Sequence, residues 1–298
     1  MPNSQIRLIH ARTAQPFPAA PDESVQFSSA NNGWRGILVE QHEMTAMEFP
    51  EHYVQGHRLI VQTGQPVSYE WRQGSRWQTT TLQPGMFCLQ SHGELNLPRW
   101  HGRFEFLAIA LEPEFLEQGF RVSDPGAIRF RERRGGFDPV ISQFAARFRS
   151  EIQSGSYCGV LYGESLALAF SRYLLEQHSH SSQLISTERG QLSPRQLQEI
   201  IDLIHTDLPT ELSLTDLAKH LNLSPFHFAR LFKHSLGLSP HQYVLQNRIE
   251  RAKKLIATTP KLSLTEIGLQ VGFYDQTHFG KAFKRTVGLS PKQFAKQM

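Results

Sequence analysis

Two short stretches near the C-terminus place basic residues between apolar ones at helical spacing. The first, 228–233, contains Arg230 between two Phe residues, and the second, 279–285, contains Lys281 in the same setting. An Arg side chain can donate two hydrogen bonds to N7 and O6 of a guanine, and Lys and Arg side chains neutralise phosphates. A helix that buries its Phe residues and exposes its basic ones therefore predicts contacts with nucleic acid.

Both stretches lie in a sequence repeat. LSLTDLA at 212–218 matches LSLTEIG at 262–268 with an offset of 50, and GLSP at 237–240 matches GLSP at 288–291 with an offset of 51. A solenoid needs at least three repeats to bury its faces, so two copies predict a tandem pair of small helical modules.

Each copy carries the signals of two helices joined by a turn. Ser213 and Ser263 each precede an acidic residue by three positions, which is the pattern of a capping box at the start of a helix. The second helices are expected to start at Ser224 and Asp275 and to end at Gly237 and Gly288. Two short helices of this kind, the second carrying basic residues, predict a helix-turn-helix.

At these residues the sequence resembles a known family. The block 272–291 resembles the signature of AraC/XylS bacterial transcription regulators, and 247–255 resembles that family's linker helix. The resemblance covers about 190–298 and departs only at 294–296, where Phe-Ala-Lys replaces the usual Tyr-Arg. It implies a DNA-binding activator with a cupin-like N-terminal domain.

Matching family positions implies a set of DNA-contacting residues in the two second helices. The set comprises Phe226, Ala229, Arg230, Lys233, Gln276, Thr277, Lys281, Lys284 and Arg285. Arg230 suits guanine and Gln276 suits adenine, while Phe226, Ala229 and the Thr277 methyl suit thymine methyls. Lys233, Lys284 and Arg285 are expected at phosphates. The alternative for each is an exposed helix residue without a partner, and for Ala229 and Thr277 the two interpretations are nearly even.

The linking segment 241–257 is expected to be one helix spanning roughly 25 Å. Such a helix could hold two recognition helices about one DNA turn, ~34 Å, apart, so one chain would contact two successive major-groove segments.

Charge is distributed unevenly along the 298 residues. From 187 onward there are 15 Lys and Arg against 9 Asp and Glu, and the remainder holds 16 against 18. A basic C-terminal part beside a slightly acidic N-terminal part is typical of a nucleic-acid-binding protein with a separate sensing domain. A basic face exposed only to solvent would give the same charge. No apolar run or leader suggests a membrane or secreted protein, and two cysteines without metal spacing fit a cytoplasmic one.

The sequence pattern of the N-terminal part predicts β structure. Residues 1–33 are expected to be an irregular lead-in, followed by about eight short strands that suggest a small antiparallel barrel or jelly roll. Two amphipathic helices follow at 139–152 and 160–175, and they either form a dimer contact or only cover the barrel. The expected fold is α+β and multidomain: a cupin-like domain at 1–178, a linker at 179–191, and an all-α DNA-binding domain of two helix-turn-helix motifs at 192–298.

The presumed barrel carries residues suited to a small-molecule pocket. The effector candidates are His52, Tyr53, Arg58, Trp71 and Trp100. A core filled by these aromatic residues is an equally weighted alternative. Histidines 52, 57, 92 and 101 lack the spacing of a cupin metal site, so we expect neither a metal nor another cofactor.

The sequence thus predicts a promoter-binding transcription regulator that contacts double-stranded DNA and RNA polymerase and is controlled by an effector or by homodimerisation. One alternative is a regulator whose N-terminal domain binds a protein or only dimerises. Another is a β-barrel enzyme with a DNA-binding tail, which the absence of a cupin ligand set disfavours.

Overall fold

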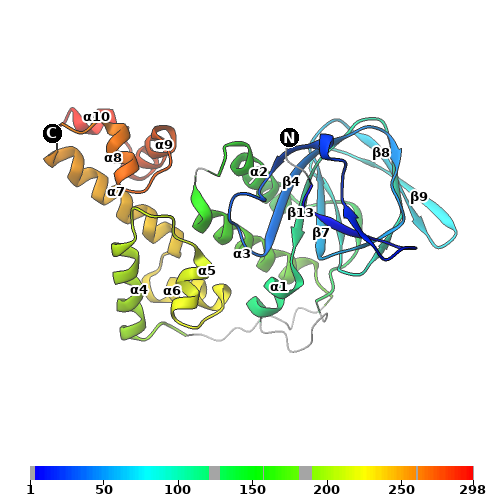
Figure 1. The fold of residues 1–298 in the computed structure, drawn as a ribbon, viewed down its shortest axis with the longest axis horizontal. Helices are drawn as coiled ribbons and strands as arrows, with labels where there is room; N and C mark the ends of the chain where they lie inside the picture. The colour runs from blue at the N-terminus through cyan, green and yellow to red at the C-terminus, as the bar shows by residue number, and fades with distance from the viewer. Residues whose placement is uncertain (1–3, 121–127, 157, 181–189, 260, 298) are drawn as a thin grey trace. The chain divides into compact units, whose positions relative to one another are not determined.

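The computed structural model describes residues 4–120, 128–156, 158–180, 190–259 and 261–297 (Figure 1). The chain divides into two compact units, one of residues 1–154 with 166–186 and the other of residues 155–165 with 187–298. Most of the predicted linker, at 181–189, lies outside the described residues. No helix in the described part of the chain is long and apolar enough to cross a membrane.

The N-terminal unit is built from three antiparallel sheets. The first contains, in spatial order, β11 (Leu95–Asn96), β6 (His52–Val54), β1 (Arg7–His10) and β2 (Pro16–Pro18). The second contains β14 (Arg133–Phe137), β10 (Met86–Gln90), β7 (His57–Gln62), β13 (Phe104–Leu111), β4 (Ile37–Met44) and β3 (Val25–Ser28). The third contains β5 (Met47–Glu48), β12 (Pro98–His101), β8 (Val67–Gln73) and β9 (Arg76–Leu82).

This architecture corrects two expectations. Residues 1–33 are not an irregular lead-in, because they contain β1, β2, a short 3-10 helix (Asp22–Ser24) and β3. These strands form by pairing with other strands, and their sequences lack the alternation of apolar and polar residues that would predict them. The pairings among the described strands form three sheets and do not close into one barrel, so the structure establishes the antiparallel α+β class but not the cupin-like closure.

The centre of the second sheet forms the core. Strand β7 lies between β10 and β13, and its register places Leu107 opposite Val61 and Ile109 opposite Leu59. All four side chains are buried, and both strands lie in the interior of the six-stranded sheet. Helix α2 (Pro139–Gln153) packs against β4 and starts where Asp138 caps it (Figure 1). The unit also contains α1 (Pro113–Phe120) and the later turns of α3 (Gly159–His178).

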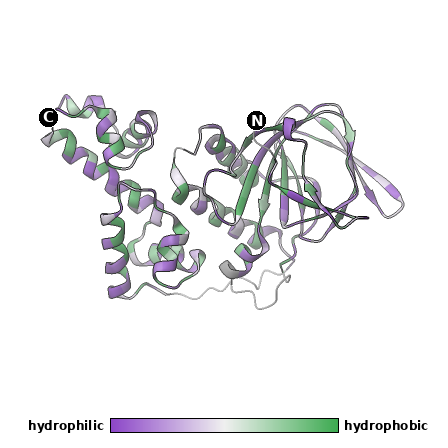
Figure 2. Cartoon of the chain, in the orientation of Figure 1, coloured by the Kyte–Doolittle hydropathy of each residue, from purple (hydrophilic) through white to green (hydrophobic). Residues whose placement is uncertain are grey.

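The C-terminal unit consists of short helices with one longer helix among them. These are α4 (Pro194–Thr206), α5 (Leu214–His220), α6 (Pro225–Leu236), α7 (Pro240–Thr258), α8 (Leu264–Gln270), α9 (Gln276–Val287) and α10 (Pro291–Ala295). Hydrophilic and hydrophobic segments alternate along these helices in Figure 2, as they do in amphipathic helices. Helix α7 confirms the linking helix predicted at 241–257 and extends one residue further at each end.

Candidate functional site

Helices α5 and α6, here called module 1, form a helix-turn-helix. The Ser213 hydroxyl accepts from the Asp216 N–H at 2.9 Å to start α5, and the Ser224 hydroxyl accepts from the His227 N–H at 3.3 Å to start α6. Between the helices, Asn222 has φ 54°, a left-handed conformation that Asn tolerates better than most residues. The caps predicted at both serines are confirmed.

Helices α8 and α9, here called module 2, repeat this construction. Ser263 and Glu266 form a complete capping box, and the Asp275 carboxylate accepts from the His278 N–H at 2.7 Å to start α9. A Cβ on Gly268 would stand 3.2 Å from the Phe279 ring, so glycine lets the two helices approach closely. Gly272, in the turn, has φ 97°.

Helix α7 joins the modules, and Arg248 anchors it. Its Nε donates to the Leu208 carbonyl at 3.0 Å and its Nη2 to the Thr210 carbonyl at 2.8 Å. A Cβ at Gly272 would lie 2.6 Å from the Leu208 oxygen and 2.9 Å from the guanidinium. The turn of module 2 thus packs against the segment that precedes module 1, and the two modules sit on one framework.

The predicted DNA-contacting residues differ in exposure. Lys233, Gln276, Thr277, Lys281, Lys284 and Arg285 are exposed, Ala229 and Arg230 are partly buried, and Phe226 is buried. Gln276 and Thr277 occupy the first turn of α9, the part of a recognition helix that meets base edges. Phe226 is only 8% exposed, so it presents little surface to a thymine methyl.

Two histidines of this unit are held neutral. Burial, and then the charge of Arg285, lower the pKa of His241 to about 4. Burial also lowers the pKa of His278 to about 4, against the opposing effect of Asp275. Neither contributes positive charge at neutral pH, so lysine and arginine side chains supply the basic character of the surface.

In the N-terminal unit the effector candidates separate into three groups. His52 and Arg58 are buried and adjacent, with Arg58 Nη2 3.3 Å from His52 Nε2. Trp100 is an apolar core residue whose Nε1 donates to the Thr45 carbonyl at 2.8 Å, and Trp71 packs half-buried beside that core. Tyr53 is 40% exposed because it alternates with the buried residues of β6, so the structure does not bring it to the other candidates.

Strand register adds three residues that sequence reasoning missed. Gln90 lies opposite Arg58, and Asn96 lies opposite His52. Arg134 lies opposite Cys88 on β14, and its Nη2 donates to Asn96 Oδ1 at 3.3 Å. Their partners are 32 to 44 residues distant in sequence, and 133–137 is a glycine-containing stretch without alternation, so no local pattern pointed to them.

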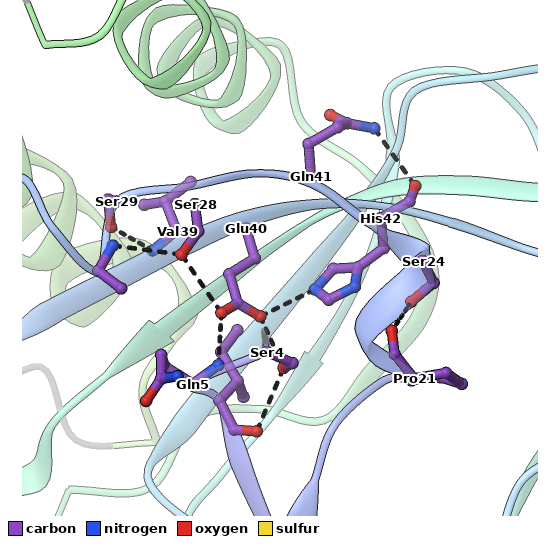
Figure 3. Close-up of polar contacts among 12 residues, drawn as sticks. Ser4, Gln5, Pro21, Ser24, Ser28, Ser29, Val39, Glu40, Gln41 and His42 are labelled. Atoms are coloured by element: carbon purple, nitrogen blue, oxygen red, sulfur yellow. Dashed lines mark hydrogen bonds and ion pairs between the residues drawn. The ribbon is translucent and has the colours of Figure 1, made fainter. Parts of the chain in front are cut away.

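A second buried polar group surrounds Glu40 on β4 (Figure 3). Its carboxylate accepts from the Ser4 hydroxyl at 2.8 Å and the Gln5 N–H at 2.7 Å, and His42 Nε2 lies 3.1 Å away. Burial raises the pKa of Glu40, but His42 and the two donors outweigh it and hold that pKa below its ordinary value. These contacts tie the N-terminal segment to β4.

The N-terminal unit contains two cavities of interest. An open cleft of about 720 Å³ lies between β1, the residues flanking β7 and β10, and α1, and His57, His92 and Arg129 contribute to its wall. An inner cavity of about 30 Å³ is lined by apolar side chains together with His42, Arg58 and Tyr69. No cluster of three metal-ligating side chains occurs among the described residues.

The paired helix-turn-helix modules define a class: helical domains that bind nucleic acid through two recognition helices. Residues 217–297 match a protein-family model described as a helix-turn-helix domain. The Msm operon regulatory protein of Streptococcus mutans is 39% identical over 159 residues, covering 53% of this chain and 54% of that protein. The Arabinose operon regulatory protein of Escherichia coli is 37% identical over 81 residues, covering 27% of each.

Further similarities agree with these. The HTH-type transcriptional regulator MtrA of Neisseria gonorrhoeae is 36% identical over 103 residues, covering 35% of this chain and 34% of that protein. A transcriptional regulator structure from Chromobacterium violaceum, described as an AraC-type DNA-binding domain-containing protein, is 31% identical with a TM-score of 0.33, covering 35% of this chain and 91% of that one. The chain spans about half or less of the length of these curated relatives. In its helix-turn-helix part the chain is similar to transcription regulators of the AraC/XylS type.

Proposed function

We propose that this chain is a sequence-specific DNA-binding transcription regulator, acting as an activator at promoters. The observation that carries the proposal is the pair of recognition helices, α6 and α9, held on one framework by α7 and Arg248. Helix α7 has 19 residues, and at 1.5 Å per residue it is about 28 Å long, close to one DNA turn of ~34 Å.

In this proposal each recognition helix enters a major groove. Arg230 donates to a guanine edge from α6, and Gln276 pairs with an adenine from the first turn of α9. Thr277 and Ala229 meet thymine methyls, Lys281 approaches the same groove, and the remaining exposed cations contact phosphates. Those phosphate-contacting cations are Lys233, Lys284 and Arg285.

The test uses the full chain. Duplexes retained by the protein from a random pool are sequenced, and the affinity of the resulting consensus is measured for wild type, Arg230→Ala and Gln276→Ala. A matched control is Arg12→Ala, which removes one exposed charge from the N-terminal unit. We expect a consensus with two segments one helical turn apart, altered at one base pair by each module variant and unaltered by the control. Failure to enrich any sequence would reject the proposal.

We propose further that the N-terminal part, 1–178, is a cupin-like domain that controls the DNA-binding part, 192–298, through a linker at 179–191. The supporting observation is that buried polar side chains and an inner cavity occur together in its β-core. A cytoplasmic location and contact with RNA polymerase complete the proposal. Measuring transcription from a promoter that carries the selected consensus, with and without the chain, tests activation directly.

Dimerisation through this unit is a second candidate function. Tyr53 and Leu95 are opposite neighbours on β6 and β11 and are 40% and 50% exposed. Adjacent exposed apolar side chains on a sheet favour an interface. Sedimentation of the full chain and of Leu95→Asp tests it: the wild type should sediment as a dimer and the variant as a monomer.

A further inference from the structure

The hydrogen bonds around Arg58 leave donors in excess. The arginine cluster is defined as Arg58, His52, Gln90, Asn96 and Arg134. Arg58 Nε and Nη2 both donate to Gln90 Oε1, at 2.9 and 2.8 Å. His52 Nδ1 donates to the Pro50 carbonyl at 2.7 Å, which leaves Nε2 as the acceptor for Arg58 Nη2 at 3.3 Å and Asn96 Nδ2 at 3.4 Å.

Three buried N–H-bearing atoms of this cluster have no protein acceptor among the described residues. They are Gln90 Nε2, Arg134 Nε and Arg134 Nη1. Gln90 is 1% exposed and the Arg134 side chain 5%, so bulk water does not reach them freely. Buried donors are normally paired, because leaving one unpaired is unfavourable. The cluster therefore has unused hydrogen-bond donors that could bind an acceptor from outside the protein.

The charges of the cluster point the same way. Arg134 forms an ion pair with Glu132, whose side chain is 51% exposed, and no carboxylate pairs with Arg58 in the described part of the chain. His52 adds no negative charge, and burial, followed by the charge of Arg58, lowers its pKa to about 3. Burial lowers the pKa of Arg58 to about 10, so it remains cationic at neutral pH. Two guanidinium groups thus share one carboxylate at the edge of the cluster.

We propose that the arginine cluster is a binding site for a small organic carboxylate, which Arg58 and Arg134 hold through its oxygens. This inference rests on the proposed control function of the N-terminal part and names the class of its effector. Arginine presents a planar set of donors that matches a carboxylate, and burial strengthens the attraction. A neutral or cationic ligand would leave the guanidinium charges uncompensated.

The inner cavity indicates what the rest of the ligand resembles. It shares Arg58 with the arginine cluster, and its wall also includes Phe49, Ile60 and Trp100. Apolar walls favour a hydrocarbon tail over the fully charged surface of inorganic phosphate. About 30 Å³ holds roughly two water-sized groups, so short-chain acids fit before long ones.

Tryptophan fluorescence of the full chain provides a specific readout. All four Trp residues, at 34, 71, 77 and 100, lie in the N-terminal unit, so their thermal transition reports that unit. The probes are acetate, propionate and butyrate, the matched amides, and inorganic phosphate, all at constant ionic strength. At 100-fold excess over Kd, an acid should raise the Tm by about 5–10 °C, with no shift from amide or phosphate.

Adjacent arginines on β14 give a matched pair of variants. Arg134→Gln should abolish the shift caused by the acids, whereas Arg133→Gln, at an exposed position of the same strand, should retain it. Arg134→Met, measured without ligand, should unfold at the same or a higher temperature than wild type, since the buried charge serves a ligand. A large drop in Tm for Arg134→Met would assign Arg134 a structural role and overturn the proposal.

Other outcomes are equally decisive. The proposal is wrong if no acid stabilises the wild type, if amides or phosphate stabilise it as well as acids do, or if both Gln variants respond alike. DNA binding, measured on the same samples, separates this inference from the proposed function. An acid that raises the Tm but leaves DNA affinity unchanged supports the site and rejects control of DNA binding by it.

Discussion

Modules 1 and 2 are built alike internally and differ where they face outward. Phe228 and Phe232 in α6, and Phe279 and Phe283 in α9, are all fully buried, and each helix starts at a capping side chain and ends at a left-handed glycine. Their outer positions diverge. At the position where module 1 has buried Phe226, module 2 has exposed Thr277.

The next equivalent outer position shows the same trend, with Arg230 partly buried and Lys281 exposed. Packing constrains the residues of the inner face, so both modules bury Phe at the same positions. The outer face is free to vary, and under the proposed function this variation would let the two modules recognise different DNA segments.

The largest effect should come from the shared inner face. Phe232→Ala and Phe283→Ala should each lower the free energy of unfolding by about 3–5 kcal/mol, because each removes a fully buried ring and leaves a cavity. Denaturant unfolding followed by far-ultraviolet circular dichroism measures the loss. Lys233→Ala and Lys284→Ala, at neighbouring exposed positions, should stay within about 0.5 kcal/mol of wild type. A clearly smaller loss for one Phe variant would show that the modules are not equivalent inside.

The next largest difference should come from substitutions in the turns of the two modules. Gly272→Ala should cost about 1–3 kcal/mol, because a left-handed backbone disfavours alanine and its Cβ would meet the Leu208 carbonyl at 2.6 Å. Asn222→Gly, at the equivalent turn position, should change stability by less than about 0.5 kcal/mol, since glycine adopts φ 54° readily. Equal costs for the two changes, measured by the same unfolding assay, would contradict the different packing of the turns.

DNA binding should distinguish base contacts from phosphate contacts. Arg230→Ala should cost about 1–3 kcal/mol on the selected duplex and relax preference at one base pair. Lys284→Ala should weaken binding to all duplexes and make the salt dependence shallower by about one unit. Fluorescence anisotropy titrations at several salt concentrations measure both. If both variants lost affinity equally and without sequence dependence, the assignment of roles would be wrong.

The smallest effect concerns pH. His278 has a folded pKa of about 4, below the ordinary 6.5, so the unfolded chain binds more protons between these values. Its contribution to stability is therefore complete above pH ~6.5 and declines as the pH falls toward 4. Between pH 7 and pH 5, His278→Gln should lose less stability than the wild type. The slope of its unfolding free energy against pH should be smaller by an amount that corresponds to up to about one bound proton. His234→Gln, at an exposed position, is the control, and an unchanged pH slope in His278→Gln would refute the burial argument.

The C-terminal unit was predictable from sequence because its signals are local. A Ser or Asp cap, a helical spacing of Phe, and a glycine at the helix end all act within one or two turns, and the repeat states each signal twice. Exposure was harder to predict, as Phe226 shows, since it depends on what packs over the helix. In the N-terminal unit, β1 to β3 and the arginine cluster depend on pairing between distant strands. Arg134 meets Asn96 only because β14 and β11 converge, and no short-range pattern encodes that.

The attachment of Arg248 to the Leu208 and Thr210 carbonyls has a consequence for promoter architecture. Each inserted base pair turns the distal DNA segment by roughly 35° about the duplex axis, since a full turn takes about 10–10.5 base pairs. A scaffold fastened at its middle cannot swivel to follow that rotation. If both recognition helices bind DNA as proposed, we expect the spacing between their two segments to be fixed. Base substitutions should then be tolerated one at a time, whereas a single inserted or deleted base pair between the segments should release one recognition helix.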